Sequence, residues 1–237
     1  TRLARDAQTR IRILEVGAGT GGTSAEVFAR LKPYQEHITE YCYTDLSQAF
    51  LSHARKSYGS KVSYLKTRLL DIERPIAAQG LELGGYDLMI AANVLHATRN
   101  IRRSLRNAKA ALRRHGLLVL NELSEGSLSL HATFGLLEGW WLSEDTALRL
   151  PGGPVLSQET WTRVLEAEGF GRVLSPLAAA GDLGQQIIVA ESDGLVRQRL
   201  QKKDRVKPTA GRRVPSKEKR LSSSPAMAVS QESIEEK

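Results

Sequence analysis

The 237-residue sequence contains a single cysteine, Cys42, so an intrachain disulfide is excluded and stability must come from a buried core. No run of about eighteen consecutive apolar residues occurs, which argues against a membrane-spanning helix. Residues 1–10 lack the apolar centre that a secretory signal peptide needs. Together these absences indicate a protein of the reducing cytoplasm that does not contact a membrane.

The net charge of +8 is spread unevenly along the chain. Residues 195–237 hold 12 of the 34 Lys and Arg residues but only 5 of the 26 Asp and Glu residues, so the first 194 residues are nearly neutral. A basic segment of this kind either binds nucleic acid by releasing counterions or serves as a solvated linker. We expect residues 1–193 to form a folded domain and residues 194–237 a basic, disordered linker or tail, and we favour the linker over nucleic-acid binding.

Segments with the apolar pattern of strands alternate with segments that have the apolar spacing of helices over most of the chain. This order predicts a doubly wound α/β fold with a mostly parallel sheet of seven strands and helices on both faces. An apolar run ending at Val16 predicts the first strand. The other expected strands are Ile38–Asp45, Val62–Leu70, Tyr86–Asn93, Leu117–Asn121, Arg172–Leu177 and Gln185–Ala190. The expected helices are Ser24–Leu31 and Ser157–Glu168, each with its serine as N-cap, together with Ser47–Tyr58, Ile101–Arg114 and Phe134–Leu142.

A cluster of glycines lies directly after the first expected strand, in the order E-V-G-A-G-T-G-G-T from Glu15 to Thr23. Glycine allows positive φ and close approach of a ligand to the backbone, and the next helix presents free N–H groups there. The pattern has an acid, Glu15, two residues before its first glycine, and in this it resembles the S-adenosylmethionine turn of class I methyltransferases. Gly22 also completes a G-x-G-x-x-G pattern, so the spacing alone leaves NAD open as the ligand.

Polar residues follow the other expected strands at their carboxyl ends, where open α/β sheets bind ligands. Asp45, Asp71, Asn93 and Glu122 all fall at this edge, as does Gly17. An acid at residue 45 is placed where nucleotide-binding units hold the ribose hydroxyls. The convergence predicts one site along this edge, although each residue alone is also typical of an ordinary strand-end turn.

His96 follows the fourth parallel strand and Glu122 ends the neighbouring one. An imidazole is largely neutral at pH 7 and can accept a proton, and a carboxylate beside it can orient the ring. The pair is therefore a candidate general base with its orienting acid. On position alone, His96 is more often a loop residue and Glu122 a helix cap.

In this order, several segments resemble the methyltransferase domains embedded in polyketide synthases and related hybrid synthetases. These segments are the glycine turn, Y-T-D-L-S followed by F-L, A-N-V-L-H-A-T, L-L-V-L-N-E, F-G-L-L-E-G-W-W and P-x-L-S-x-x-x-W, over about Ile11–Glu191. The resemblance implies a Rossmann-like class I methyltransferase fold and methyl transfer from S-adenosyl-L-methionine. It implies an acyl carrier protein with a phosphopantetheine-bound polyketide and neighbouring synthase domains as partners.

The resemblance also implies roles for individual residues. His96 and Glu122 correspond to a catalytic dyad, Asp45 to the ribose contact and Asp71 to the contact with the adenine amino group. No metal site is expected. The full set of implied cofactor contacts is Glu15, Gly17, Ala18, Gly19, Asp45, Leu46, Asp71, Ile72 and Asn93.

The acceptor atom is the least determined part of the prediction. Only residues 1–10 precede the expected first strand, whereas carbon-methylating relatives carry a large N-terminal lid, so we favour methylation of a β-hydroxyl or enol oxygen. Carbon methylation of a β-ketoacyl substrate is the alternative, and an inactive structural module is a further one. A nucleic-acid methyltransferase is disfavoured because Asn93-Val94-Leu95-His96 replaces the N/D-P-P-Y/F motif. Trp140 or Trp141 is a candidate contact of the acceptor.

Overall fold

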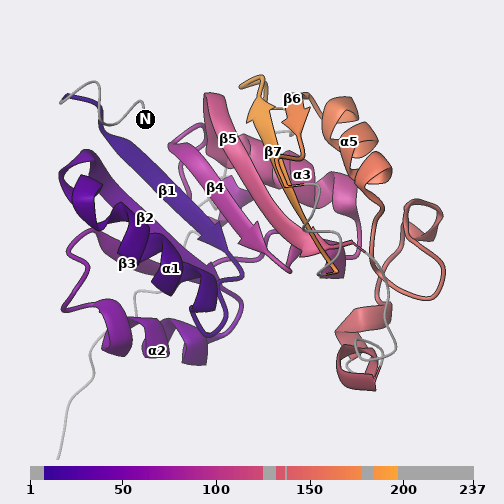
Figure 1. Cartoon of the computed structure of the whole chain (residues 1–237), viewed down its shortest axis with the longest axis horizontal. Coiled ribbons are helices and arrows are strands. Elements are labelled where there is room, and N and C mark those ends of the chain that lie inside the picture. Colours follow the sequence, from indigo (N-terminus) through magenta and orange to yellow (C-terminus); the bar gives the residue numbers. More distant parts are fainter. Residues whose placement is uncertain (1–7, 125–131, 137, 178–183, 197–237) are drawn as a thin grey trace, which may run out of the picture. The chain divides into compact units, whose positions relative to one another are not determined.

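A computed structural model describes residues 8–124, 132–136, 138–177 and 184–196 of the chain. Within them one sheet has the strand order β3-β2-β1-β4-β5-β7-β6 (Figure 1). The pairs from β3 to β5 are parallel, and β7 runs antiparallel to both β5 and β6. The predicted seven-stranded, doubly wound sheet is confirmed. The strands are β1 Ile11–Val16, β2 Ile38–Asp45, β3 Leu65–Leu69, β4 Tyr86–Ala92, β5 Leu112–Leu123, β6 Phe170–Leu174 and β7 Gln185–Ser192.

Helices cover the sheet on both faces and divide its core into two main apolar clusters (Figure 1). On one face, Phe28 of α1 and Leu51 of α2 pack with Tyr41 of β2. On the other, Leu105 of α3 and Trp161 of α5 belong to the larger cluster. The α-helices are α1 Gly22–Leu31, α2 Gln48–Tyr58, α3 Ile101–Ala111 and α5 Gln158–Ala167, and the 3-10 turns are η1 Lys32–His37, η2 Ile76–Gln79, η3 Leu95–Ala97, η4 Phe134–Leu136, η5 Glu138–Trp141 and η6 Thr146–Leu148.

The first helix begins earlier than its sequence indicates. We predicted Ser24 as its N-cap, but α1 starts at Gly22 and its N-cap is Gly21, which adopts a left-handed conformation with φ 85°. Ser24 is fully buried inside the helix, and its hydroxyl donates a hydrogen bond to Glu15. The glycine turn reaches helical geometry early, so the serine is used for packing against the strand instead of for capping.

One helix and one strand differ in length from the prediction. α3 ends at Ala111 and not at Arg114, because Leu112 is already extended and pairs with Tyr86 of β4. β3 begins at Leu65 and not at Val62, because the amide of Val62 bonds back to Tyr58 in a turn. In both places backbone hydrogen bonds outweigh side-chain periodicity.

The C-terminal half follows the prediction with shifted boundaries. Ser157 caps α5 as expected, and its side chain accepts a hydrogen bond from the amide of Thr160. The closing strand β6 begins at Phe170 and not at Arg172. Where we expect the helix Phe134–Leu142, the structure has two short 3-10 turns, η4 and η5. Residue 137 between them lies outside the described part of the chain.

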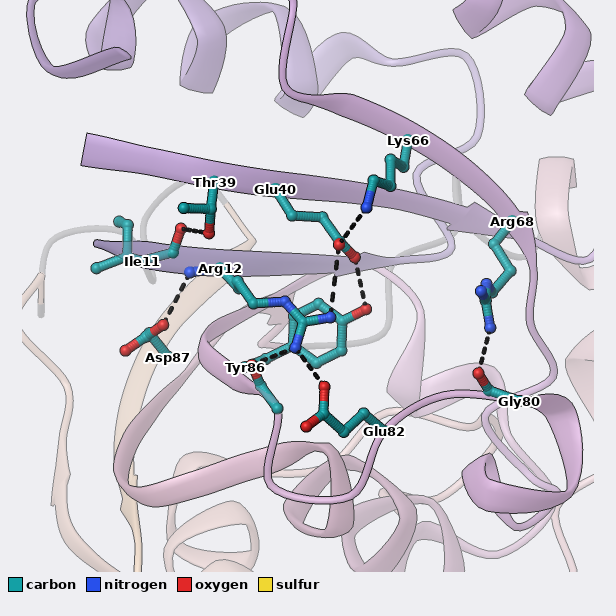
Figure 2. Close-up of polar contacts among 11 residues, drawn as sticks. Ile11, Arg12, Thr39, Glu40, Lys66, Arg68, Gly80, Glu82, Tyr86 and Asp87 are labelled. Atoms are coloured by element: carbon teal, nitrogen blue, oxygen red, sulfur yellow. Dashed lines mark hydrogen bonds and ion pairs between the residues drawn. The ribbon is translucent and has the colours of Figure 1, made fainter. Parts of the chain in front are cut away.

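A polar network ties together the amino-terminal ends of four strands (Figure 2). Glu40 of β2 lies at its centre and accepts hydrogen bonds from Lys66 of β3 and the hydroxyl of Tyr86 of β4, each at 2.9 Å. Arg12 of β1 lies over the Tyr86 ring at 4.7 Å and bonds Glu82 at 2.7 Å. Burial alone would raise the pKa of Glu40, but these partners lower it overall. The network braces the edge of the sheet that lies away from the predicted site.

The chain divides into two units, Thr1–Arg199 and Leu200–Lys237. The second unit and most of the expected basic tail lie outside the described residues. A search of the described residues finds no helix with the length and hydropathy needed to cross a membrane.

Candidate active site

The glycine turn after β1 needs glycine for two separate reasons. Gly17, Gly19 and Gly21 all have positive φ, at 62°, 58° and 85°. In addition, a Cβ at Gly17 would lie 2.6 Å from a methyl carbon of Val94, which follows β4. The turn is thus packed directly against the loop that carries His96.

Glu15 supports this turn from inside the protein. Its side chain is buried, and it accepts hydrogen bonds from Ser24 Oγ at 2.5 Å and from Tyr41 Oη at 2.7 Å. Burial raises the pKa of Glu15, and the two hydrogen bonds act in the opposite direction. These two hydrogen bonds hold the first turn of α1 against β1 and β2, and Glu15 does not line the neighbouring cavity.

Asp45 connects the end of β2 to the same turn. One carboxylate oxygen accepts a hydrogen bond from the amide of Gly19 at 2.9 Å, and the other accepts one from the amide of Ser47 at 2.8 Å. Both contacts use backbone donors, so the carboxylate is held in a fixed direction at the edge of the sheet.

A cavity of about 260 Å³ lies at the carboxyl ends of β1, β2 and β4. Six of the nine predicted cofactor residues line it, namely Gly17, Asp45, Leu46, Asp71, Ile72 and Asn93. Glu15, Ala18 and Gly19 are not among its lining residues. The cavity combines the carboxylates of Asp45, Asp71 and Glu73 with the apolar side chains of Leu46 and Ile72. Carboxylates accept hydrogen bonds from hydroxyl and amino groups, so this lining fits a nucleoside. Leu46 is 72% exposed, so an apolar surface is available at this cavity to cover a planar base.

The structure brings His96 and Glu122 into direct contact. His96 lies in η3, is 4% exposed, and its Nδ1 is hydrogen-bonded to a carboxylate oxygen of the fully buried Glu122. The second oxygen of Glu122 accepts hydrogen bonds from the amides of Leu95 at 2.9 Å and Val94 at 3.3 Å. One carboxylate therefore orients both the imidazole and the backbone that carries it. The Nε2 atom lies on the opposite side of the ring, where it can accept a proton.

A second, mostly apolar cavity of about 320 Å³ adjoins His96. Trp140 packs edge-on against the imidazole with ring centroids 6.1 Å apart, and Phe134 stacks on Trp140. Trp141 is 57% exposed and does not line this cavity, so of the two tryptophans only Trp140 is placed to touch an acceptor there. The lining residues are Asn93, His96, Ala97, Leu123, Phe134, Gly139, Trp140 and Gln185.

The two cavities share a wall. Asn93 and Ala97 line both, so a molecule in one would lie next to a molecule in the other. Asn93 directly follows β4 and has φ 56°, a left-handed conformation that asparagine tolerates better than most residues. The buried Oε1 of Gln185 has no hydrogen-bond partner in the part of the chain that the structure describes, and it offers a polar group to an acceptor.

Sequence reasoning missed several residues that shape the site. Ala97 and Thr98 line the first cavity and belong to the A-N-V-L-H-A-T segment, so their position after a strand end was a usable signal. Gln185 begins a strand that was predicted, but nothing in its neighbourhood indicated an acceptor cavity. Arg149, which contacts the main chain of His96, lies in an aperiodic segment that carries no signal at all.

Comparison with known proteins agrees with this geometry. Residues 14–118 match the family described as "Methyltransferase domain". Polyketide synthase PksM of Bacillus subtilis (strain 168) is 58% identical over 199 residues, which make up 84% of this chain and 5% of that protein. The chain thus spans a small part of this relative.

Two solved structures extend the comparison. The DszA carbon methyltransferase has 42% sequence identity and a TM-score of 0.76, covering 83% of this chain and 51% of that one. The trans-methyltransferase CalH, solved in complex with SAH, has 34% identity and a TM-score of 0.67, covering 77% and 51%. With its glycine turn, strand-end acids and sheet order, the chain belongs to the class I methyltransferase domains of polyketide synthases, and its methyl donor is S-adenosylmethionine.

Proposed function

We propose that the domain methylates the α-carbon of a β-ketoacyl group carried on the phosphopantetheine arm of an acyl carrier protein. The observation that carries this proposal is the likeness to the DszA carbon methyltransferase, at 42% identity and a TM-score of 0.76. The comparisons favour this alternative over oxygen methylation, which we had preferred because so few residues precede β1. That reasoning fails because the chain covers only 51% of the carbon methyltransferase, so its starting point says nothing about a lid.

The site chemistry suits a carbon acid. A hydrogen between a ketone and a thioester is far more acidic than the hydrogen of a secondary alcohol, so one imidazole is a sufficient base. His96 Nε2 takes the proton, the electron pair of the broken C–H bond forms the enolate, and the new C–C bond forms at that carbon. Glu122 stabilises the imidazolium through Nδ1–H. Bound S-adenosylmethionine supplies the methyl group, and its sulfur keeps the electron pair of the broken C–S bond.

The first cavity is the proposed cofactor site. Asp45 accepts hydrogen bonds from the ribose hydroxyls and Asp71 accepts one from the adenine amino group, while Leu46 and Ile72 cover the base. The positive φ and missing side chains of Gly17 and the turn beyond it make room for the amino-acid end of the cofactor. The second cavity then receives the acyl chain, with Trp140 excluding water from the base.

The test uses the full chain with a methyl-deuterated cofactor and two acceptors, acetoacetyl carrier protein and 3-hydroxybutyryl carrier protein. Mass spectrometry of the released acyl groups should find the label on the α-carbon of the first and no label on the second. A label on the hydroxyl oxygen would restore the oxygen-methylating alternative. Absence of cofactor binding in calorimetry would instead favour a structural module.

The domain boundaries form part of the same proposal. Residues 1–193 constitute the methyltransferase core, and residues 194–237 form a linker toward a neighbouring synthase domain. The concentration of 12 Lys and Arg residues in 195–237, without apolar periodicity, supports a solvated segment. Removing residues 194–237 should leave the melting temperature and methyl transfer nearly unchanged. Tight, salt-sensitive binding of duplex DNA by the full chain would revive the nucleic-acid interpretation.

A further inference from the structure

Arg149 is a buried cation that lines neither of the two cavities. It lies directly after η6, and its side chain is only 2% exposed. One guanidinium nitrogen donates to the carbonyl of His96 at 2.6 Å, and another donates to the carbonyl of Thr98 at 2.9 Å. The guanidinium also donates to the carbonyl of Pro154 at 2.8 Å. Its planar fork thus spans the main chain on both sides of Ala97.

Among the described residues, Arg149 forms an ion pair with one carboxylate, that of Asp145. Its Nε donates to Asp145 at 2.7 Å, and the other oxygen of Asp145 accepts the amide of Ile101 at 2.7 Å, at the start of α3. A buried charge is tolerated when it is paired and its donors are hydrogen-bonded, and here the charge is paired and four of the five N–H donors bond to described residues. The Asp145–Arg149 pair therefore joins three segments: its own loop, the first turn of α3 and the end of η3.

The short turn that carries His96 is held at both ends by opposite charges. At its start, the carboxylate of Glu122 accepts the amides of Val94 and Leu95. At its end, the guanidinium of Arg149 donates to the carbonyls of His96 and Thr98. An isolated 3-10 turn leaves these N–H and C=O groups without internal partners, so each charge satisfies the groups that the turn cannot.

We propose that Arg149 is a positioning residue for the general base: it fixes the main chain of His96 so that Nε2 points at the acceptor. This inference rests on the proposed role of His96. A misplacement of the base by about 1 Å is enough to slow a reaction about 10²-fold, and loss of the guanidinium fork removes both anchors on the carbonyl side of η3. A lysine could keep the charge but could not span the two carbonyls.

The test compares Arg149→Lys with Arg106→Lys in the full chain. Arg106 makes an equally specific contact, a double hydrogen bond to Glu168 between α3 and the end of α5, away from both cavities. We expect Arg149→Lys to lower the single-turnover rate of methyl transfer by about 10–10²-fold. Affinity for S-adenosylmethionine, measured by calorimetry, should stay within about twofold of wild type. Arg106→Lys should lower the melting temperature and leave the rate unchanged.

Two further measurements separate positioning from a purely structural role. Hydrogen–deuterium exchange at the α-carbon of acetoacetyl carrier protein, with S-adenosylhomocysteine bound, reports the base alone and should fall by the same factor as methyl transfer. Free guanidinium at millimolar concentration should partly restore the rate of Arg149→Ala. A wild-type rate in Arg149→Lys, failure of that variant to fold, or equal losses of rate in Arg149→Lys and Arg106→Lys would overturn the proposal.

The same variants distinguish this inference from the proposed function. If the wild-type chain places the methyl group on oxygen, carbon methylation is wrong. The rate comparison between Arg149→Lys and Arg106→Lys then still decides the role of Arg149 on that acceptor. If wild type methylates carbon and Arg149→Lys is as fast, only the positioning role fails.

Discussion

Replacing Gly17 by alanine tests the contact between the glycine turn and the loop of His96. The added Cβ would lie 2.6 and 2.8 Å from the two methyl carbons of Val94, at a backbone φ of +62°. The left-handed backbone costs a non-glycine residue about 1–2 kcal/mol. Forcing a methyl group into a packed contact costs about 1–3 kcal/mol more. The free energy of unfolding should therefore fall by about 2–5 kcal/mol.

Gly19→Ala is the matched control. Its φ is +58°, and a Cβ there would meet nothing within 4 Å, so this variant bears only the backbone cost of about 1–2 kcal/mol. Urea unfolding of both variants, followed by circular dichroism, should thus separate them by about 1–3 kcal/mol. The difference between the two isolates the steric contact with Val94.

The two variants should also differ in activity. A displaced Val94 weakens the hydrogen bond between its amide and Glu122, so Gly17→Ala should slow methyl transfer more than it weakens cofactor binding. Equal losses of unfolding free energy in Gly17→Ala and Gly19→Ala would refute the reasoning, because the packed contact would then contribute nothing.

Three further outcomes are expected. His96→Ala should lower the methyl-transfer rate by about 10²–10⁴-fold with little change in cofactor affinity by calorimetry, and Glu122→Gln should lower it less, because an amide keeps a hydrogen bond but loses the charge. Asp45→Asn should weaken binding of S-adenosylmethionine and of its demethylated product alike; a change in turnover alone would move Asp45 to the acceptor side. Burial alone would raise the pKa of Glu168, but hydrogen bonds from Arg106 and Arg102 of α3 lower this pKa below the ordinary 4.5. The stabilisation from ionised Glu168 is therefore present above pH 4.5 and is lost as the pH falls through the lowered pKa of the folded state. In acid denaturation, Glu168→Gln should thus lose less free energy of unfolding between neutral and acid pH than wild type does.

Elements bounded by clear signals were predicted well from the sequence. β2 has the predicted bounds, Ile38–Asp45, because an apolar run ends at an acid. The contact between His96 and Glu122 was predicted for a general reason, since the carboxyl ends of adjacent parallel strands meet at one edge. Topology therefore brought together residues that local patterns only suggested.

Features that depend on contacts distant in sequence could not be predicted. Residues Leu112–Arg114 look helical, yet they extend because Leu112 pairs with Tyr86 in the sheet. Ser24 looked like a cap, but the carboxylate of Glu15 draws it inward. Arg149 bonds the carbonyl of a residue 53 positions earlier, and such a hydrogen bond leaves no periodic trace in either segment. Hydrogen bonds between residues distant in sequence leave no repeating pattern of the kind that apolar residues leave in helices and strands.

Glu122 has a consequence for anyone who wishes to graft this dyad onto another α/β scaffold. Copying a histidine and a glutamate to two adjacent strand ends would transfer the ring contact alone. The carboxylate here is shared with two amides of the chain that bears the histidine, so the recipient must reproduce the path of Val94 and Leu95 as well. The unit that can be transplanted is a whole strand-to-turn segment together with its glutamate.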